Sequence, residues 1–193
     1  MKRILLVSYY PPSRRHAGGQ RLLDLYAELK RIQPDLYLAL VSCSGESLEL
    51  DLLKAIFDEI HCVASDEFSK QGISRLIFGV PGFELVDLQY HQSGFLINSF
   101  RARWPSATLV FSPMESQLRA AKIFFTQNRR NLWRSWRNML GLMLNAMAET
   151  AHVLRADRVV TVSEADRATL AFMKRAGMVV CLPTCISSRE ISP

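Results

Sequence analysis

The sequence predicts an α/β protein with a doubly wound parallel sheet of about seven strands and helices on both faces. Short runs rich in Val, Ile and Leu recur along the chain, and longer segments with helical spacing separate them. This alternation is typical of βαβ units, whose crossover helices cover a parallel sheet. With 193 residues, 49% of them hydrophobic and 22% charged, the chain is long enough for one well-buried domain.

The apolar runs predict the strands, and the segments between them predict the helices. The expected strands span residues 3–8, 36–42, 59–63, 85–90, 107–112, 158–162 and 178–181. The expected helices span residues 20–32, 47–57, 115–125, 131–154 and 165–175. Glycine and proline interrupt segment 64–83, which predicts a loop that holds a short helix. We expect residues 1–186 to form one domain and residues 187–193 to form a tail or the start of a linker.

The net charge of +6 is unevenly distributed along the chain. Residues 1–34 carry seven bases and two acids, residues 35–91 carry three and ten, and residues 92–193 carry fourteen and six. We therefore expect an anionic partner to meet the first loop or the second half of the chain. Nucleic acid is not an expected partner, because no recognisable nucleic-acid module is present.

The expected location is the cytoplasm, including the inner face of a membrane. The apolar start ends at Ser8 without a signal-peptide cleavage site, and no apolar run approaches the length of a membrane span. Cys43, Cys62, Cys181 and Cys185 lack the spacing of a zinc site and are expected to be reduced thiols. We expect neither a metal nor a bound cofactor.

Gly18 and Gly19 stand between the first strand and the first helix. Two glycines at the positive end of a helix dipole let backbone N–H groups approach a phosphate closely. The spacing is that of neither a dinucleotide fingerprint nor a Walker loop. A simple turn from loop to helix is the alternative explanation.

A second region gives these glycines a context. Glu149 lies near the end of a long helical segment, Ala156–Glu164 reads ADRVVTVSE, and Val179–Thr184 reads VVCLPT. Together with the proline and double-glycine opening, these segments resemble the amino-terminal domain of GT-B glycosyltransferases of family 4. The resemblance covers about residues 3–186 and implies a Rossmann-like domain that forms the amino-terminal half of a GT-B enzyme.

The resemblance also implies site residues. Gly18 and Gly19 match a loop near the donor diphosphate and the acceptor, and Ser163 and Glu164 match the turn after the sixth strand. Both places lie at the carboxyl edge of the sheet, where doubly wound folds bind ligands.

Two further residues are weak catalytic candidates. Glu115 follows the fifth strand, although the sequence has Met114 where many members have a histidine. Placement of charge at a helix start is the alternative role for Glu115. His91 follows the fourth strand, and a structural histidine is the alternative there. The catalytic residues therefore remain unknown at this stage.

The resemblance implies transfer of a sugar, with retention, from a nucleotide sugar to a polysaccharide or lipid-linked acceptor. Family members bind the donor chiefly through a carboxyl-terminal domain, which this sequence lacks. We expect the chain to be inactive alone and to need that domain or a separate subunit as a partner. The alternative is a non-catalytic domain that binds a glycan, a lipid or a protein. Self-association through the open edge of the sheet is a further expectation.

The segment 128–139 combines arginine with tryptophan. On a helix, Arg130, Arg134 and Arg137 share one face, which suits an anionic bilayer or is a solvated basic face. Met139, Met143 and Met147 have helical spacing and are expected in the core. Arg14 and Arg15 in the first loop either contact an anionic acceptor or are surface charge.

Overall fold

The structure, a computed structural model, confirms the predicted fold class. It describes residues 2–43, 49–76, 81–127, 136–175 and 177–183, with the side chains of Trp136 and Arg137 left out. Seven strands form one parallel sheet in the order β3-β2-β1-β4-β5-β6-β7. They are β1 (Arg3–Ser8), β2 (Tyr37–Cys43), β3 (Glu59–Val63), β4 (Leu85–Gln89), β5 (Thr108–Ser112), β6 (Arg158–Thr161) and β7 (Val179–Cys181). The order reverses between β1 and β4, as in Rossmann-like folds.

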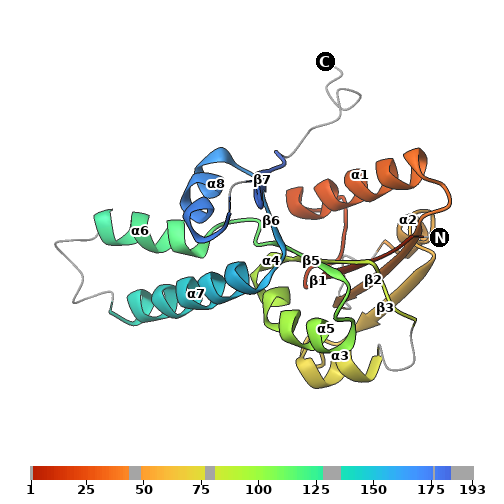
Figure 1. The fold of residues 1–193 in the computed structure, drawn as a ribbon, viewed down its shortest axis with the longest axis horizontal. Helices are drawn as coiled ribbons and strands as arrows, with labels where there is room; N and C mark the ends of the chain where they lie inside the picture. The colour runs from red at the N-terminus through yellow and green to blue at the C-terminus, as the bar shows by residue number, and fades with distance from the viewer. Residues whose placement is uncertain (1, 44–48, 77–80, 128–135, 176, 184–193) are drawn as a thin grey trace, which may run out of the picture.

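Helices connect the strands and lie on both sides of the sheet (Figure 1). They are α1 (Ala17–Ile32), α2 (Leu50–Lys54), α3 (Lys70–Leu76), α4 (Tyr90–Ser93), α5 (Ile97–Arg103), α6 (Gln117–Gln127), α7 (Trp136–Arg155) and α8 (Glu164–Leu170). Two 3₁₀ turns, η1 (Gly94–Leu96) and η3 (Ala171–Met173), extend α4 and α8. The predicted strands and helices are confirmed to within a few residues at most ends.

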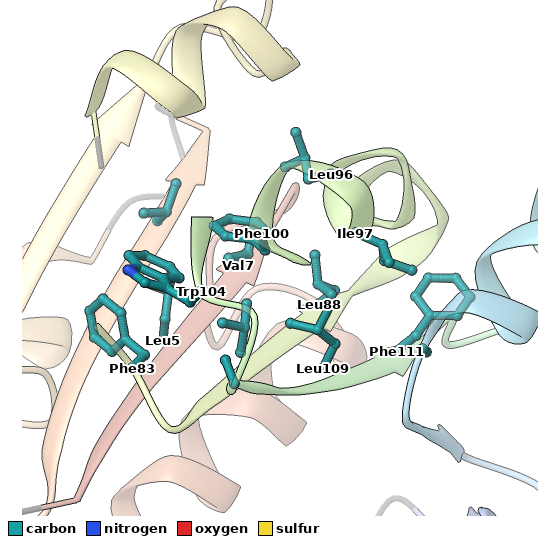
Figure 2. Packing of buried hydrophobic residues seen from close by; sticks show 14 of the residues in the cluster. Leu5, Val7, Phe83, Leu88, Leu96, Ile97, Phe100, Trp104, Leu109 and Phe111 are labelled. Carbon is teal, nitrogen blue, oxygen red and sulfur yellow. The ribbon is translucent and has the colours of Figure 1, made fainter. Parts of the chain in front are cut away.

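Side chains alternate along each strand and therefore supply two separate cores. On one face, Leu6, Leu38 and Leu40 pack with residues of α1 and α2. On the other, the larger core joins α3, α5, α7 and α8 to the sheet. Phe100 of α5 lies at its centre, close to Val7 and Trp104, and Phe111 lies nearer α7 (Figure 2).

The helical segment between β4 and β5 was not expected from the sequence. The predicted strand ran to residue 90, whereas β4 ends at Gln89 and α4 begins at Tyr90. Tyr90 has a φ of 68°, and a strand cannot continue through that conformation. The apolar side chains of Leu96, Ile97 and Phe100 then bury α5 against the sheet.

The prediction that the α7 methionines belong to the core is wrong for two of them. α6 and α7 form a hairpin that extends beyond the sheet (Figure 1). Met143 is 42% and Met147 is 66% exposed, because this half of α7 has no sheet beneath it. α7 buries Ala146, Glu149 and Val153 instead.

The larger core predicts the cost of a cavity. Phe100 is fully buried and stacks on Trp104 at a centroid distance of 5.8 Å. Phe100→Ala should therefore lower the free energy of unfolding by about 3–5 kcal/mol in urea denaturation. Phe172→Ala is the matched control, because Phe172 is 77% exposed and its truncation should change the value by less than about 0.5 kcal/mol. Equal losses in the two variants would contradict this packing.

Candidate functional site

A cleft of about 500 Å³ opens at the carboxyl edge of the sheet. The turns after β1, β4, β5 and β6 and one residue of α7 line it: Tyr10, His16, Ala17, Gly18, Tyr90, His91, Gln92, Pro113, Met114, Glu115, Gln117, Asn145 and Val162. β1 and β4 are the neighbours at which the strand order reverses. Ligands of doubly wound sheets bind at this place, since the connections leave it in opposite directions.

The first helix opens onto the cleft through its N-terminus. His16 is its N-cap, and Nδ1 of His16 accepts a 2.8 Å hydrogen bond from the backbone N–H of Gly19. The N–H groups of Ala17 and Gly18 have no acceptor within the helix, because they belong to its first turn. Both residues line the cleft and lie at the positive end of the helix dipole.

Gly18 and Gly19 are small for different reasons. A Cβ on Gly19 would lie 2.6–2.7 Å from the backbone O and N of Ser13, so the loop requires glycine there. A Cβ on Gly18 would lie 2.5 Å from Oη of Tyr90 and 2.8 Å from Cε of Met114. Gly18 therefore lets the turns after β4 and β5 approach the helix, and Gly19 supports the loop behind it.

Tyr90 and Met114, which flank Gly18, each have a φ of 68°. This left-handed conformation costs a non-glycine residue of the order of 1 kcal/mol or more, and such residues cluster at functional sites. Burial raises the pKa of Tyr90 to about 12, so its hydroxyl is protonated and able to donate. Its oxygen is buried without a hydrogen-bond partner.

The remaining polar groups of the cleft suit a ligand with many hydroxyl groups. Gln92, Gln117 and Asn145 carry both donors and acceptors, and Glu115 is an exposed carboxylate. Burial lowers the pKa of His91, so its imidazole is neutral at pH 7, and both of its ring nitrogens are buried without a hydrogen-bond partner. Tyr10 packs edge-on against Tyr90 at 5.0 Å and is 46% exposed.

His152 of α7 lies behind His91. Their ring centroids are 5.6 Å apart, and Phe95 and Phe111 contact the His152 ring at 4.7 and 5.6 Å. His152 is 3% exposed and neither of its ring nitrogens has a hydrogen-bond partner. Burial, with the charge on His91 and more distant cations, lowers the pKa of His152 to about 4. Two phenylalanines, Phe95 and Phe111, thus pack around the histidine that lies behind His91.

A buried polar network fixes α1 to β4, one of the two strands that flank the switch point, which is the place where the strand order reverses. Oη of Tyr26 donates to Asp87 at 2.7 Å, and Gln89 donates to the same carboxylate oxygen at 2.7 Å. Arg21 is 5% exposed and donates to Sδ of Met114 and to the carbonyl of Leu182. Burial lowers the pKa of Arg21, whereas the Asp87 carboxylate opposes that shift. Because Arg21 lies one turn after Gly18, this network positions the helix start at the cleft.

The residues that carry the family resemblance have structural partners. Glu149 is fully buried and accepts hydrogen bonds from Ser116 Oγ and from the N–H groups of Gln117 and Leu118, so it caps α6. Asp157 accepts from the N–H of Leu109 at 2.7 Å. These contacts hold the turn after β5 and join β6 to β5.

Ser163 and Glu164 lie at the same edge of the sheet but do not line the cleft. Ser163 caps α8 by accepting from the N–H of Asp166. Glu164 is exposed and paired with Arg167 at 2.6 Å. Their neighbour Val162 reaches the cleft instead. A ligand-binding role for these two residues stays a prediction.

The other predicted site residues are divided between the cleft and the surface. Gly18, His91 and Glu115 come together in the lining, whereas Gly19 is buried behind it. Arg14 and Arg15 are exposed in the loop that precedes His16, and the backbone N–H of Arg14 donates to Glu49. Arg130 and Arg134 lie outside the described residues, and Arg137 belongs to α7 without a described side chain.

The described cysteines are not part of this site. Cys43, Cys62 and Cys181 are free, and burial raises the pKa of Cys43 to about 11. A thiol with so high a pKa is protonated at neutral pH and is a poor nucleophile. Within the described ranges, no three His, Cys, Asp or Glu side chains form a group that could hold a metal ion.

Comparison with known proteins supports the fold. No protein-family model matches the sequence, and no curated protein matches it. Among solved structures, the chain is similar to the N-terminal domain of trehalose-6-phosphate phosphatase from Candida albicans, with a TM-score of 0.57 and 13% identity over 98% of this chain and 50% of that one. It is also similar to a UGT transferase from Siraitia grosvenorii in complex with UDP, with a TM-score of 0.56 and 9% identity over 98% of this chain and 53% of that one.

These similarities indicate a Rossmann-like, GT-B-like fold. The identities are low, so the similarity establishes the fold and not the family. The chain spans about half the length of the two structures that it matches.

Three residues at or behind the cleft were not predicted from the sequence: Tyr90, Arg21 and His152. Tyr90 is the last residue of a predicted strand, and that position was the available signal, but the sequence-based candidate was its neighbour His91. Arg21 stands on the first predicted helix among leucines and gave no sign of being buried. The contact between His91 and His152 joins residues far apart in the sequence, so spacing could not predict it.

Gly19 is crowded and Gly141 is not, so adding a methyl group should have opposite effects on stability at these two positions. Gly19→Ala should lower the free energy of unfolding by about 1–3 kcal/mol, because the added Cβ meets the backbone of Ser13. Gly141→Ala is the matched control, since Gly141 lies within α7 and nothing is within 4 Å of its Cβ position. It should raise the value by about 0.5–1 kcal/mol in the same urea titration. A neutral Gly19→Ala would contradict the loop packing.

His152 predicts a loss of stability in acid. Its pKa falls from 6.5 to about 4 on folding, so the unfolded chain binds a proton that the folded protein does not. The resulting contribution of His152 to the free energy of unfolding is present above pH 6.5. It is lost as the pH falls towards 4, by roughly 3 kcal/mol in all. Denaturation midpoints at pH 7 and pH 4.5 should differ less in His152→Leu than in the original protein. An equal difference would exclude His152 as the cause.

Proposed function

We propose that this chain is the acceptor-binding half of a retaining GT-B glycosyltransferase, of family 4 in particular. The complete enzyme transfers a sugar from a nucleotide sugar to a polysaccharide or lipid-linked acceptor. The observation that supports this proposal best is the contact of Gly18 with Tyr90 and Met114. It places the N-terminus of α1 and the turns after β4 and β5 around one cleft at the switch point of the sheet.

The chemistry of the cleft supports a sugar acceptor. A sugar offers hydroxyl groups that amides and carboxylates bind and C–H faces that aromatic rings cover. Gln92, Gln117 and Asn145 supply the amides, and Tyr10 and Tyr90 supply the rings. His91 is neutral at pH 7 and is our candidate for holding the acceptor's proton, with Glu115 as the other candidate.

One face of β5, β6 and β7 supports the proposal of a second domain. Val110, Val160 and Val180 point away from the larger core, and Val180 is 44% exposed. The described residues of α1 and α2 pack instead over β1 and β2 on that face. Parallel sheets are normally covered on both faces. A carboxyl-terminal domain, in the same chain or a separate subunit, is the partner that we propose for this region and for donor binding.

A non-catalytic binding domain is the second candidate. Met114 occupies the place in which many family members have a histidine, and this observation favours it. Such a protein keeps the acceptor cleft and binds a glycan without transferring a sugar. The two candidates differ when the chain is combined with a complementing carboxyl-terminal half, because only the first then shows transfer.

Calorimetric titration of the full chain tests acceptor binding. Oligosaccharides cut from bacterial polysaccharides are the probes, and UDP-glucose is the donor probe. We expect at least one oligosaccharide to bind and the donor to bind weakly. Tyr90→Phe should weaken oligosaccharide binding threefold to tenfold, because one hydroxyl donor is lost. Gly18→Ala should weaken it more, because its methyl group displaces Tyr90 or Met114 into the cleft.

Gly141→Ala is the control for this titration, since it adds the same methyl group on an open surface of α7. It should bind like the original protein. Tight binding of UDP-glucose by this chain alone would overturn the assignment to the acceptor half. Oligosaccharide binding that is equal in Gly18→Ala and Gly141→Ala would place the glycan outside the cleft.

A further inference from the structure

A second concave surface lies on the helices, away from the sheet. It has a volume of about 680 Å³ and lies between α6, α7 and α8, and we call it the helical groove. Most of its lining is apolar, including Leu118, Phe125, Met143, Met147 and Phe172. Phe172 is 77% and Met147 is 66% exposed. Water-exposed apolar patches of this kind mark sites that bind a partner or a membrane.

The two helices of the hairpin, α6 and α7, are basic. α6 and α7 contain a single acidic residue, Glu149, and it is fully buried. Lys122 lines the groove and is exposed, whereas Arg119 of α6 is paired with Asp166 of α8. An exposed cation beside an apolar lining favours an occupant that is anionic as well as apolar.

A second copy of the chain is a poor occupant. Two identical grooves in contact would bring the two copies of Lys122 together, and that juxtaposition of like charges opposes association. None of the described helices has the length and apolar character needed to cross a bilayer, so contact with a membrane would be made along its surface. Methionine side chains adapt their shape to flexible apolar partners such as acyl chains.

We propose that the helical groove docks on an anionic membrane. An acyl chain of an anionic lipid lies between α6, α7 and α8, against Met147 and Phe172, and Lys122 contacts the phosphate groups. This inference does not depend on the proposed sugar transfer, because it concerns a different surface. An acidic protein is the competing occupant, and the test below separates the two.

Sedimentation of the full chain with vesicles tests the proposal. Vesicles of phosphatidylglycerol in phosphatidylcholine should bind the protein, and vesicles of phosphatidylcholine alone should bind it far less. Phe172→Ser combined with Met147→Ser should reduce binding about tenfold or more, because two inserted side chains are lost. Lys122→Ala should reduce it about fivefold. All three positions are exposed, so the variants should fold like the original protein.

Matched controls lie on other helices. Ile32→Ser removes an apolar side chain that is 62% exposed at the end of α1, and Lys54→Ala removes an exposed cation of α2. Neither should change vesicle binding. Binding that is absent, equal on neutral vesicles, or lost equally in the controls would overturn the proposal, as would loss in Lys122→Ala without loss in the apolar variant.

Methyl NMR with isotope-labelled methionine locates the lipid. The chain has seven methionines, and two of them, Met143 and Met147, line the groove. Titration with a soluble short-chain phosphatidylglycerol should shift these two methyl signals in a saturable manner. Shifts confined to other methionines, or an absence of shifts while an acidic protein produces them, would overturn the membrane assignment.

Discussion

The unpaired N–H groups of helices that start at the carboxyl edge of the sheet constrain this domain more than any other feature. Each such helix needs acceptors for its first turn, and a buried start without them costs free energy. His16 supplies an acceptor for α1, Ser163 supplies one for α8, and Glu149 supplies two for α6. Glu149 comes from α7, so the same hydrogen bonds hold the helical hairpin together. The motif residues of the sequence therefore build the edge on which the cleft lies.

The cleft lies at the backbone N–H groups that the N-cap of α1 does not satisfy. The first N–H groups of α1 remain available, and Gly18 lets Tyr90 and Met114 approach them. Both residues have a strained backbone, and the surrounding packing must maintain that strain. The network of Arg21, Tyr26 and Asp87 does so in part, because it fixes α1 against β4 and contacts Met114. Strain, an unpartnered hydroxyl and a helix start thus coincide at the switch point, where the topology alone places a ligand.

Sequence periodicity was sufficient for the sheet, because every strand contains apolar residues in a short run or in alternation between turn residues. It was insufficient wherever tertiary contacts decided the outcome. The left-handed conformation of Tyr90 ends β4 and has no signal in an apolar pattern. Met143 and Met147 have core spacing, but the hairpin extends past the sheet and leaves them exposed. The site was predictable at Gly18, which follows a strand, and was not predictable at His152, whose contacts come from distant segments.

The cleft and the helical groove are two sides of the same helices. Asn145 of α7 lines the cleft and its sequence neighbour Ala146 lines the groove, and Gln117 and Leu118 divide in the same way at the start of α6. A helix is about 10 Å across, so the two surfaces lie about one helix diameter apart. We propose a lipid-linked acceptor over a free polysaccharide on this ground, because the same pair of helices lines both surfaces.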